Sequence, residues 1–229
     1  MSKKTCLMIL AVMAGLISVR VSALPTTPKN IEPASCAMTS RGLHDTWAPY
    51  ANLPDKQFKQ KTGYEKAAFL AAQGDADELW KSLRRTKSNA SAAEYRIALV
   101  EALNSAILWQ HRDMMRTLVR RGAPLDGIDG AKAHPLLLAI SCRDHEAAGF
   151  LLDHGADMYV KAEGKADALW EAVTSKDSTS VDMLLDAGFD PCVDHARENG
   201  RGALVYRDEA AARLGFSAAQ VKRLRCSAG

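Results

Sequence analysis

Three adjacent Asp–His pairs are the residues of this sequence that could carry acid–base chemistry: Asp144-His145, Asp153-His154 and Asp194-His195. A carboxylate that orients an imidazole is a common arrangement at general-base sites. Neighbouring residues on a helix point in different directions, however, so a pair at i,i+1 does not form such a contact. We therefore interpret these histidines as structural or surface residues.

Other motifs of known chemistry are absent from the sequence. It contains no Gly-x-Ser-x-Gly elbow, His-Glu-x-x-His helix, Walker loop or Gly-x-Gly-x-x-Gly turn. No cysteine spacing resembles a CxxC pair, which argues against a zinc site. The sequence predicts no catalytic residue, no metal and no cofactor, and a protein that is not an enzyme; a hydrolase is the outlying alternative.

The first 23 residues have the pattern of a secretory signal peptide. Two lysines precede an almost wholly apolar run from Cys6 to Val19, and Val21-Ser22-Ala23 supplies small residues at a cleavage point. The run is too short to span a bilayer comfortably, and a buried N-terminal helix fits the basic start poorly. We expect residues 1–23 to be removed on export to the periplasm or beyond, leaving no membrane insertion.

Four cysteines remain after that cleavage, and an even number in an exported chain favours disulfides. Four cysteines allow three pairings. We prefer a bond between Cys192 and Cys226, which would staple the C-terminal end, and a second between Cys36 and Cys142. Free buried thiols are the alternative.

Helical patterning begins near Thr62, after an extended or irregular segment at 24–60 that is rich in proline. The loop between the first two helical pairs is expected to be longer than in the later pairs. An aspartate cap is predicted at Asp75, and capping boxes at Ser91…Glu94 and Ser217…Gln220. We expect helices over 64–73, 76–85, 91–109, 111–121, 135–142, 145–154, 167–174, 178–187, 203–214 and 217–225.

A repeat of 33 residues runs through the middle of these helices. Leu-Val-Arg-Arg-Gly-Ala at 118–123 recurs as Leu-Leu-Asp-His-Gly-Ala at 151–156 and Leu-Leu-Asp-Ala-Gly-Phe at 184–189. Self-similarity at this period indicates stacked helix-turn-helix units. The glycines suit a left-handed residue at a helix end, the alanines allow close approach of helices, and the leucines face the core. The positions in register are Gly122, Gly155 and Gly188; Leu118, Leu151 and Leu184; and Ala106, Ala139 and Ala172.

These units resemble the ankyrin repeat, which has a Thr-Pro-Leu-His start, paired alanines, a Gly-His turn and a Leu-Leu-x-x-Gly-Ala-Asp end. The best unit joins His134-Pro135-Leu136-Leu137-Leu138-Ala139 to Phe150-Leu151-Leu152-Asp153-His154-Gly155-Ala156-Asp157. The next joins Asp167-Ala168-Leu169-Trp170-Glu171-Ala172 to Met183-Leu184-Leu185-Asp186-Ala187-Gly188-Phe189-Asp190. Leu137 and Trp170 stand where His is usual, and Arg143-Asp144 replaces the Gly-His turn.

The resemblance is strong over 101–200, weaker over 64–100 and absent before residue 60. It implies an all-α, ankyrin-type helical solenoid of about four repeats over 61–200. An irregular segment at 24–60 would precede it, and two C-terminal helices in 201–229 would cap its last apolar face.

In ankyrin families, partners usually meet the turns between repeats and the exposed side of the first helix in each unit. The resemblance places Trp109, Cys142, Thr174 and Ser175 on such helices. Trp109 is of particular interest because Trp is a favoured interface anchor, although packing against its own chain is the alternative. The candidate binding residues are Trp109 and, in the turns, Asp126, Asp129, Lys132, Lys161, Glu163, Lys165, Asp194 and Arg197.

Charge is balanced overall but uneven along the chain. Removing Lys3, Lys4 and Arg20 from 30 basic residues leaves 27, against 27 acidic residues. A nucleic-acid binder would normally carry a basic excess, so that class is disfavoured. Residues 24–121 hold 15 basic and 10 acidic side chains, 122–200 hold 6 and 15, and 201–229 hold 6 and 2. The acidic middle is either a solvated face or a surface that steers a partner with a basic surface.

The sequence thus favours an exported protein-binding module. Periplasmic ankyrin proteins of this general size include immunity proteins, so the resemblance implies an immunity protein that neutralises a secreted antibacterial effector by occlusion. The alternatives are a periplasmic scaffold or accessory protein that stabilises a resident enzyme or envelope complex, and a secreted host-protein binder.

Overall fold

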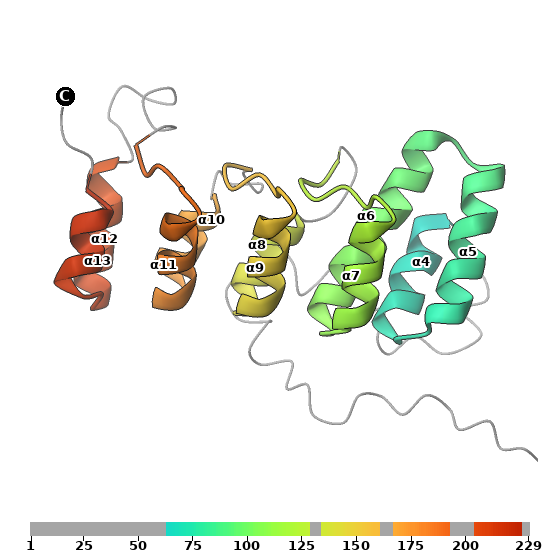
Figure 1. Cartoon of the computed structure of the whole chain (residues 1–229), viewed down its shortest axis with the longest axis horizontal. Helices are drawn as coiled ribbons and strands as arrows, with labels where there is room; N and C mark the ends of the chain where they lie inside the picture. Colours follow the sequence, from blue (N-terminus) through green and yellow to red (C-terminus); the bar gives the residue numbers. More distant parts are fainter. Residues whose placement is uncertain (1–62, 129–133, 161–166, 193–203, 226–229) are drawn as a thin grey trace, which may run out of the picture. The chain divides into compact units, whose positions relative to one another are not determined.

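The computed structural model describes residues 63–128, 134–160, 167–192 and 204–225 (Figure 1). All four ranges belong to one compact unit, residues 31–229. Their regular secondary structure is entirely helical, so the predicted all-α class is confirmed. The predicted signal peptide and the irregular segment at 24–60 lie outside the described residues.

Ten helices lie within these ranges, and their bounds agree with the predicted ones to within about two residues except at the end of α5. They are α4 (Gly63–Ala72), α5 (Ala76–Asn89), α6 (Ala92–Leu108), α7 (Arg112–Arg120), α8 (Pro135–Ser141), α9 (His145–Asp153), α10 (Ala168–Thr174), α11 (Ser178–Asp186), α12 (Leu204–Leu214) and α13 (Ala218–Arg223).

Consecutive helices form pairs, which follow one another in chain order (Figure 1). The first helices of successive pairs contact each other, from α4 through α6, α8 and α10 to α12, and α11 contacts both α9 and α13. The buried apolar side chains form one cluster from Ala67 to Leu224. All the leucines and alanines of the 33-residue register are fully buried in it: Leu118, Leu151, Leu184, Ala106, Ala139 and Ala172.

Two residues with a left-handed backbone conformation recur at the 33-residue spacing. The first, which the sequence predicts, follows the second helix of a pair, where Gly122, Gly155 and Gly188 have φ of 83°, 85° and 92°. After each glycine, the next backbone N–H donates to the carbonyl of the register leucine, as in Ala156 to Leu151 at 3.0 Å. These bonds satisfy a carbonyl at the end of the helix. The sequence interpretation is confirmed at all three glycines.

The second recurring position lies in the turn inside each pair and was not predicted. Gln110, Arg143 and Lys176 have φ of 55°, 53° and 57°, a conformation that side chains other than glycine rarely adopt. The residue that follows each of them donates its N–H to the carbonyl of the register alanine at 2.8 to 2.9 Å. This hydrogen bond closes the turn against the buried alanine in all three pairs, although a different residue occupies the left-handed position in each.

The expected long loop between the first two pairs is wrong. Only Ala90 and Ser91 separate α5 from α6. The extra residues lengthen the helices instead, since α5 continues past Arg85 to Asn89 and α6 has 17 residues. No glycine or proline interrupts the sequence between Arg85 and Ala90, so nothing stops α5 earlier.

The predicted helix starts are confirmed. The Asp75 carboxylate accepts the Glu78 N–H at 3.1 Å, and Ser91 and Ser217 each form a complete capping box. Aspartates also cap α9, α10 and α11 through Asp144, Asp167 and Asp177. Each cap satisfies an N–H that has no partner within its own helix.

Candidate binding surface

The Asp–His pairs do not form catalytic contacts within the described residues. His145 Nε2 lies 2.9 Å from Oδ2 of Asp177, one repeat further along, and not against its neighbour Asp144. His154 Nδ1 lies 2.8 Å from the carbonyl oxygen of Phe150 in its own helix. The third pair, Asp194-His195, lies outside the described residues. Both described histidines therefore have structural partners, as interpreted from the sequence.

The contact between His145 and Asp177 includes a serine but does not make a nucleophile. The Ser180 hydroxyl donates to Oδ2 of Asp177 at 2.7 Å, so the carboxylate lies between the hydroxyl and the imidazole. A serine nucleophile needs the imidazole as its own partner, with the carboxylate beyond. Burial raises the pKa of Asp177, but hydrogen bonds from Ser180 and His145 outweigh it and hold that pKa below its ordinary value of 3.8.

Polar bonds join successive pairs at separations close to one repeat. Arg112 Nη2 lies 3.2 Å from Asp144 Oδ1, and Arg116 Nη2 lies 2.7 Å from Glu146 Oε1. The Ser141 hydroxyl donates to Glu171 at 2.8 Å, and Arg143 donates to the carbonyl of Ser175. Several charged side chains of the described repeats are thus bonded to the neighbouring pair.

The predicted turn residues fall mostly outside the described part of the chain. Asp126 is the exception; it is exposed, and its Oδ1 accepts the Asp157 N–H at 2.7 Å. The Asp126 carboxylate is accessible to a partner, and its hydrogen bond also connects the turn after α7 to the turn after α9. The candidates outside the described residues are Asp129, Lys132, Lys161, Glu163, Lys165, Asp194 and Arg197.

Of the predicted helix-face residues, two are exposed less than expected. Trp109 ends α6 and is half-buried, and Thr174 is exposed. Cys142 and Ser175, however, are buried, with 4% and 8% of their surface accessible. Their expected place on an open face is therefore wrong. Both follow short helices that pack closely, and every residue of α8 is buried.

Cys142 and Cys192 are each disulfide-bonded. The described residues do not include the partner of either sulfur, since the other three cysteines of the sequence, Cys6, Cys36 and Cys226, lie outside those residues. The pairing of Cys36 with Cys142 and of Cys192 with Cys226 stays a prediction.

A basic and aromatic surface on α5 was missed by the sequence analysis. Arg121 lies with its guanidinium carbon 4.1 Å from the centre of the Trp80 ring, and Lys87 Nζ lies 5.7 Å from that of Tyr95. An open hollow of about 270 Å³ is lined by Trp80, Leu83, Arg84, Lys87, Tyr95, Leu99 and Arg121. The signal was present as Trp80 with Arg84 and Lys87 at helical spacing, but a charge count along the chain does not show which side chains share a helix face.

Comparison with known proteins gives no relative from which a role could be transferred. No family model matches the chain, and no curated protein matches it. Within the described residues, no group of His, Cys, Asp and Glu side chains could hold a metal ion. None of the described helices has the length and apolar character needed to cross a membrane.

Proposed function

We propose that the chain is an exported protein-binding module built from ankyrin-type repeats, which acts by contact and not by catalysis. The observation that carries the proposal is the recurrence of one helical pair at a 33-residue spacing, with the same buried leucine, buried alanine and left-handed residues each time. Architectures of this kind present extended surfaces to other macromolecules. The resemblance to ankyrin repeats supports the same role.

As its specific form, we propose an immunity protein that occludes a secreted antibacterial effector. Its contact surface would be the turns between pairs, which hold Asp126, Asp129, Glu163 and Asp194, together with Trp109. A basic effector surface would complement those turns and be steered toward them. This step rests on similarity of type and on charge, because a fold alone does not determine a partner. A scaffold for a resident periplasmic enzyme and a secreted host-protein binder would use the same surface.

Binding to a partner from the periplasm is the test of this surface. The tagged chain is used to isolate the partner, and the affinity of the purified pair is then measured for variants of the turns. We expect Asp129→Lys with Glu163→Lys to weaken binding by tenfold or more, since close charge pairs across an interface couple by about 1.5 kcal/mol or more. Asp126→Asn removes the third charge while keeping the oxygen that accepts the Asp157 N–H.

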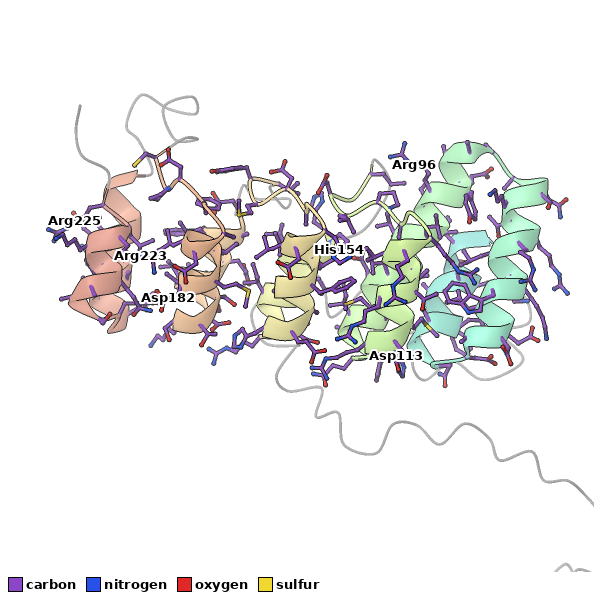
Figure 2. The ribbon with its side chains drawn as sticks, in the orientation of Figure 1. Arg96, Asp113, His154, Asp182, Arg223 and Arg225 are labelled. Atoms are coloured by element: carbon purple, nitrogen blue, oxygen red, sulfur yellow. The ribbon has the colours of Figure 1, made fainter. Side chains whose placement is uncertain are left out.

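The matched control is Asp113→Lys with Asp77→Lys, which reverses two exposed charges at the starts of α7 and α5; Asp113 lies away from the turn that follows α7 (Figure 2). Unchanged affinity in the turn variants, or an equal loss in the control, contradicts the proposed surface. Inhibition of the partner's own activity by the chain distinguishes an immunity protein from a scaffold, which would preserve that activity. Chemical turnover of the partner by the chain would contradict action by contact.

Export and the disulfides are tested on the same purified protein. Mass spectrometry of the mature chain is expected to show a new N-terminus after Ala23, and an N-terminus at Met1 contradicts export. Alkylation before and after reduction is expected to label four additional thiols only after reduction. Peptide mapping then tests the pairing of Cys192 with Cys226.

A further inference from the structure

We propose that the hollow between α5, α6 and the end of α7, which we call the α5–α7 hollow, binds an acidic segment of a partner protein. It is lined by Trp80, Leu83, Arg84, Lys87, Tyr95, Leu99 and Arg121. This site goes beyond the acidic turns proposed above, because it lies on other elements and has the opposite charge. A partner could engage either surface without the other.

The helical spacing of α5 and α6 builds the hollow. Trp80 precedes Leu83 and Arg84 by three and four residues, and Lys87 follows them by four and three, which places all four on one side of α5. Leu83 is 4% exposed and Leu99 of α6 is 3% exposed, so the two leucines belong to the core beneath the site. Arg84 and Lys87 are exposed at its rim. The hollow thus combines an apolar base with exposed cationic side chains above it.

Two aromatic rings hold cations in this hollow. The Arg121 guanidinium lies over Trp80 at 4.1 Å, and the Lys87 ammonium lies over Tyr95 at 5.7 Å. Cation–aromatic contacts of this kind are each worth about 0.5–1 kcal/mol at exposed sites, which favours one position of a flexible side chain. A pre-positioned cation loses less entropy when a carboxylate arrives.

The cations of the α5–α7 hollow have no carboxylate partner in the part of the chain that the structure describes. Neither Arg84, Lys87 nor Arg121 forms an ion pair there. Glu94, next to Tyr95 in the sequence, is used in the capping box of α6, where its Oε2 accepts the N–H and hydroxyl of Ser91 at 2.8 Å. By contrast, Arg112 and Arg116 on α7 are both paired with acids of α9. An acidic ligand therefore need not displace an ion pair of Arg84, Lys87 or Arg121, although Lys81, also on α5, is paired with Glu78 at 2.7 Å.

The cationic surface continues beyond one hollow, which favours an extended ligand. Arg84 also lines a second open hollow of about 370 Å³, together with Arg85, Ser88, Asn89 and Lys81 of α5, of which Lys81 is already paired with Glu78. Trp80 also lines a third hollow, of about 500 Å³, at the start of α7, which extends the aromatic surface but not the positive charge, since it contains Asp113 and the paired Arg112. A single small anion would contact one hollow only. A peptide that carries several carboxylates and an apolar side chain would complement the cations, the rings and the apolar base together.

The test uses the full chain and a short fluorescent peptide of alternating glutamate and phenylalanine. Anisotropy is expected to show binding, with Arg84→Glu plus Lys87→Glu raising Kd about tenfold or more. Trp80→Leu keeps an apolar side chain but removes the ring that holds Arg121, so a weaker loss of about threefold is expected. The milder pair Arg84→Gln and Lys87→Gln repeats the test if the reversed charges disturb folding.

The matched control reverses two exposed cations that do not line the hollow, Arg96 of α6 and Lys222 of α13, with the same change in net charge. Figure 2 labels Arg96 near the start of α6. Affinity for the peptide is expected to stay within about twofold in this control. An equal loss in the control overturns the proposal, as does equal binding of the peptide in which lysine replaces glutamate.

Two further probes exclude other polyanions. Phosphatidylserine vesicles and a single-stranded oligonucleotide are tested at matched charge concentration. Tighter binding to either than to the acidic peptide overturns the proposal in favour of a lipid or nucleic-acid surface, whereas weaker binding to both supports it. The result is independent of the turn variants above, so failure of this site leaves the proposed module intact and failure of the acidic turns leaves this site intact.

Discussion

The helices from α4 to α6 are held together differently from the pairs that follow. Helices α4, α5 and α6 have 10, 14 and 17 residues, whereas α8 to α11 have 7 or 9 residues each. Ten consecutive residues of α6 are buried, from Ala98 to Ile107, and its contact with α4 is the most extensive between any two described helices. Long helices that bury this much surface need few polar links.

The short helices are joined instead by side-chain bonds between one pair and the next. Most connect residues 30 to 32 positions apart, from Arg112 with Asp144 to Tyr159 with the N–H of Asp190. At the C-terminal end, Arg223 lies 3.0 Å from Asp182 of α11 (Figure 2). The two regions therefore differ in which charged side chains are accessible. The regular pairs use many of their acids internally, while α5 leaves cations available to a partner.

The largest expected effect is on the core of the regular pairs. Leu151→Ala removes a fully buried side chain from a helix of nine residues and is expected to cost about 3–5 kcal/mol. Because each pair contacts mainly its neighbours, hydrogen exchange should rise first in α8 to α11 while α4 to α6 stay protected. Leu152→Ala, at a half-buried position, is the control and should cost less. Uniform loss of protection in both regions would contradict the division between them.

The next largest effect concerns a bond between two pairs. Asp177→Ala removes the cap of α11 and the acceptor of His145 and Ser180, so a loss of about 2 kcal/mol is expected in urea unfolding. The exposed carboxylate of Asp153 is the control, and its replacement by Ala should change stability by less than about 0.5 kcal/mol.

The same variant has a defined pH dependence. The pKa of Asp177 is lower in the folded state than its ordinary 3.8, so the unfolded chain binds more protons between the two values. The stabilisation from this carboxylate is present above pH 3.8 and is lost as pH falls through the folded-state pKa. The difference in free energy of unfolding between wild type and Asp177→Ala should therefore become smaller as the pH falls below 3.8. A constant difference down to the acid transition contradicts the role of the ionised carboxylate.

The turn inside each pair offers a smaller test with opposite signs in the two regions. Gly74 occupies it in the first pair with φ of 72°, and an added Cβ would lie 2.9 Å from the His111 ring, so Gly74→Ala should cost about 1–2 kcal/mol. Lys176 occupies it in the regular region with φ of 57°, so Lys176→Gly should stabilise by about 1 kcal/mol. Thermal unfolding measures both. Destabilisation by Lys176→Gly would show that this turn carries no strain.

Periodic features of the fold could be predicted from the sequence because packing repeats them. Leu118, Leu151 and Leu184 recur in register because the same core position recurs, and the glycines recur because a left-handed residue ends each helix. The turns at Gln110, Arg143 and Lys176 were expected between the predicted helices, but their left-handed conformation could not be predicted, since none of these three residues is glycine. The extra length of α5 and α6 was misread as a loop for a related reason, because a broken period does not show which element holds the insertion.

The surface was less predictable than the core. A run of acids suggests a free acidic face, but Glu146 and Asp182 are paired with arginines of neighbouring helices that lie 30 or more residues away in the chain. Charge counts cannot show such pairing, which depends on how one helix packs on the next. Likewise, the sequence does not show that Trp80 belongs to a binding surface, because the Arg121 guanidinium that lies over its ring is 41 residues further along the chain.

The smallest expected effect tests the helical content of the regular pairs directly. Gly149 lies inside α9, and an added Cβ would meet only Met183, at 3.9 Å, an ordinary contact distance. Gly149→Ala should therefore stabilise the protein by about 0.5–1 kcal/mol, because alanine loses less backbone entropy in a helix. Ala148→Gly, in the same helix, is the reverse control and should destabilise by at least as much, since Ala148 is also fully buried. If the short helices depend more on bonds between pairs than on their own helix propensity, Gly149→Ala will raise the free energy of unfolding by much less than Asp177→Ala lowers it. A larger rise would mean that helix propensity, and not the bonds between pairs, limits the stability of the regular pairs.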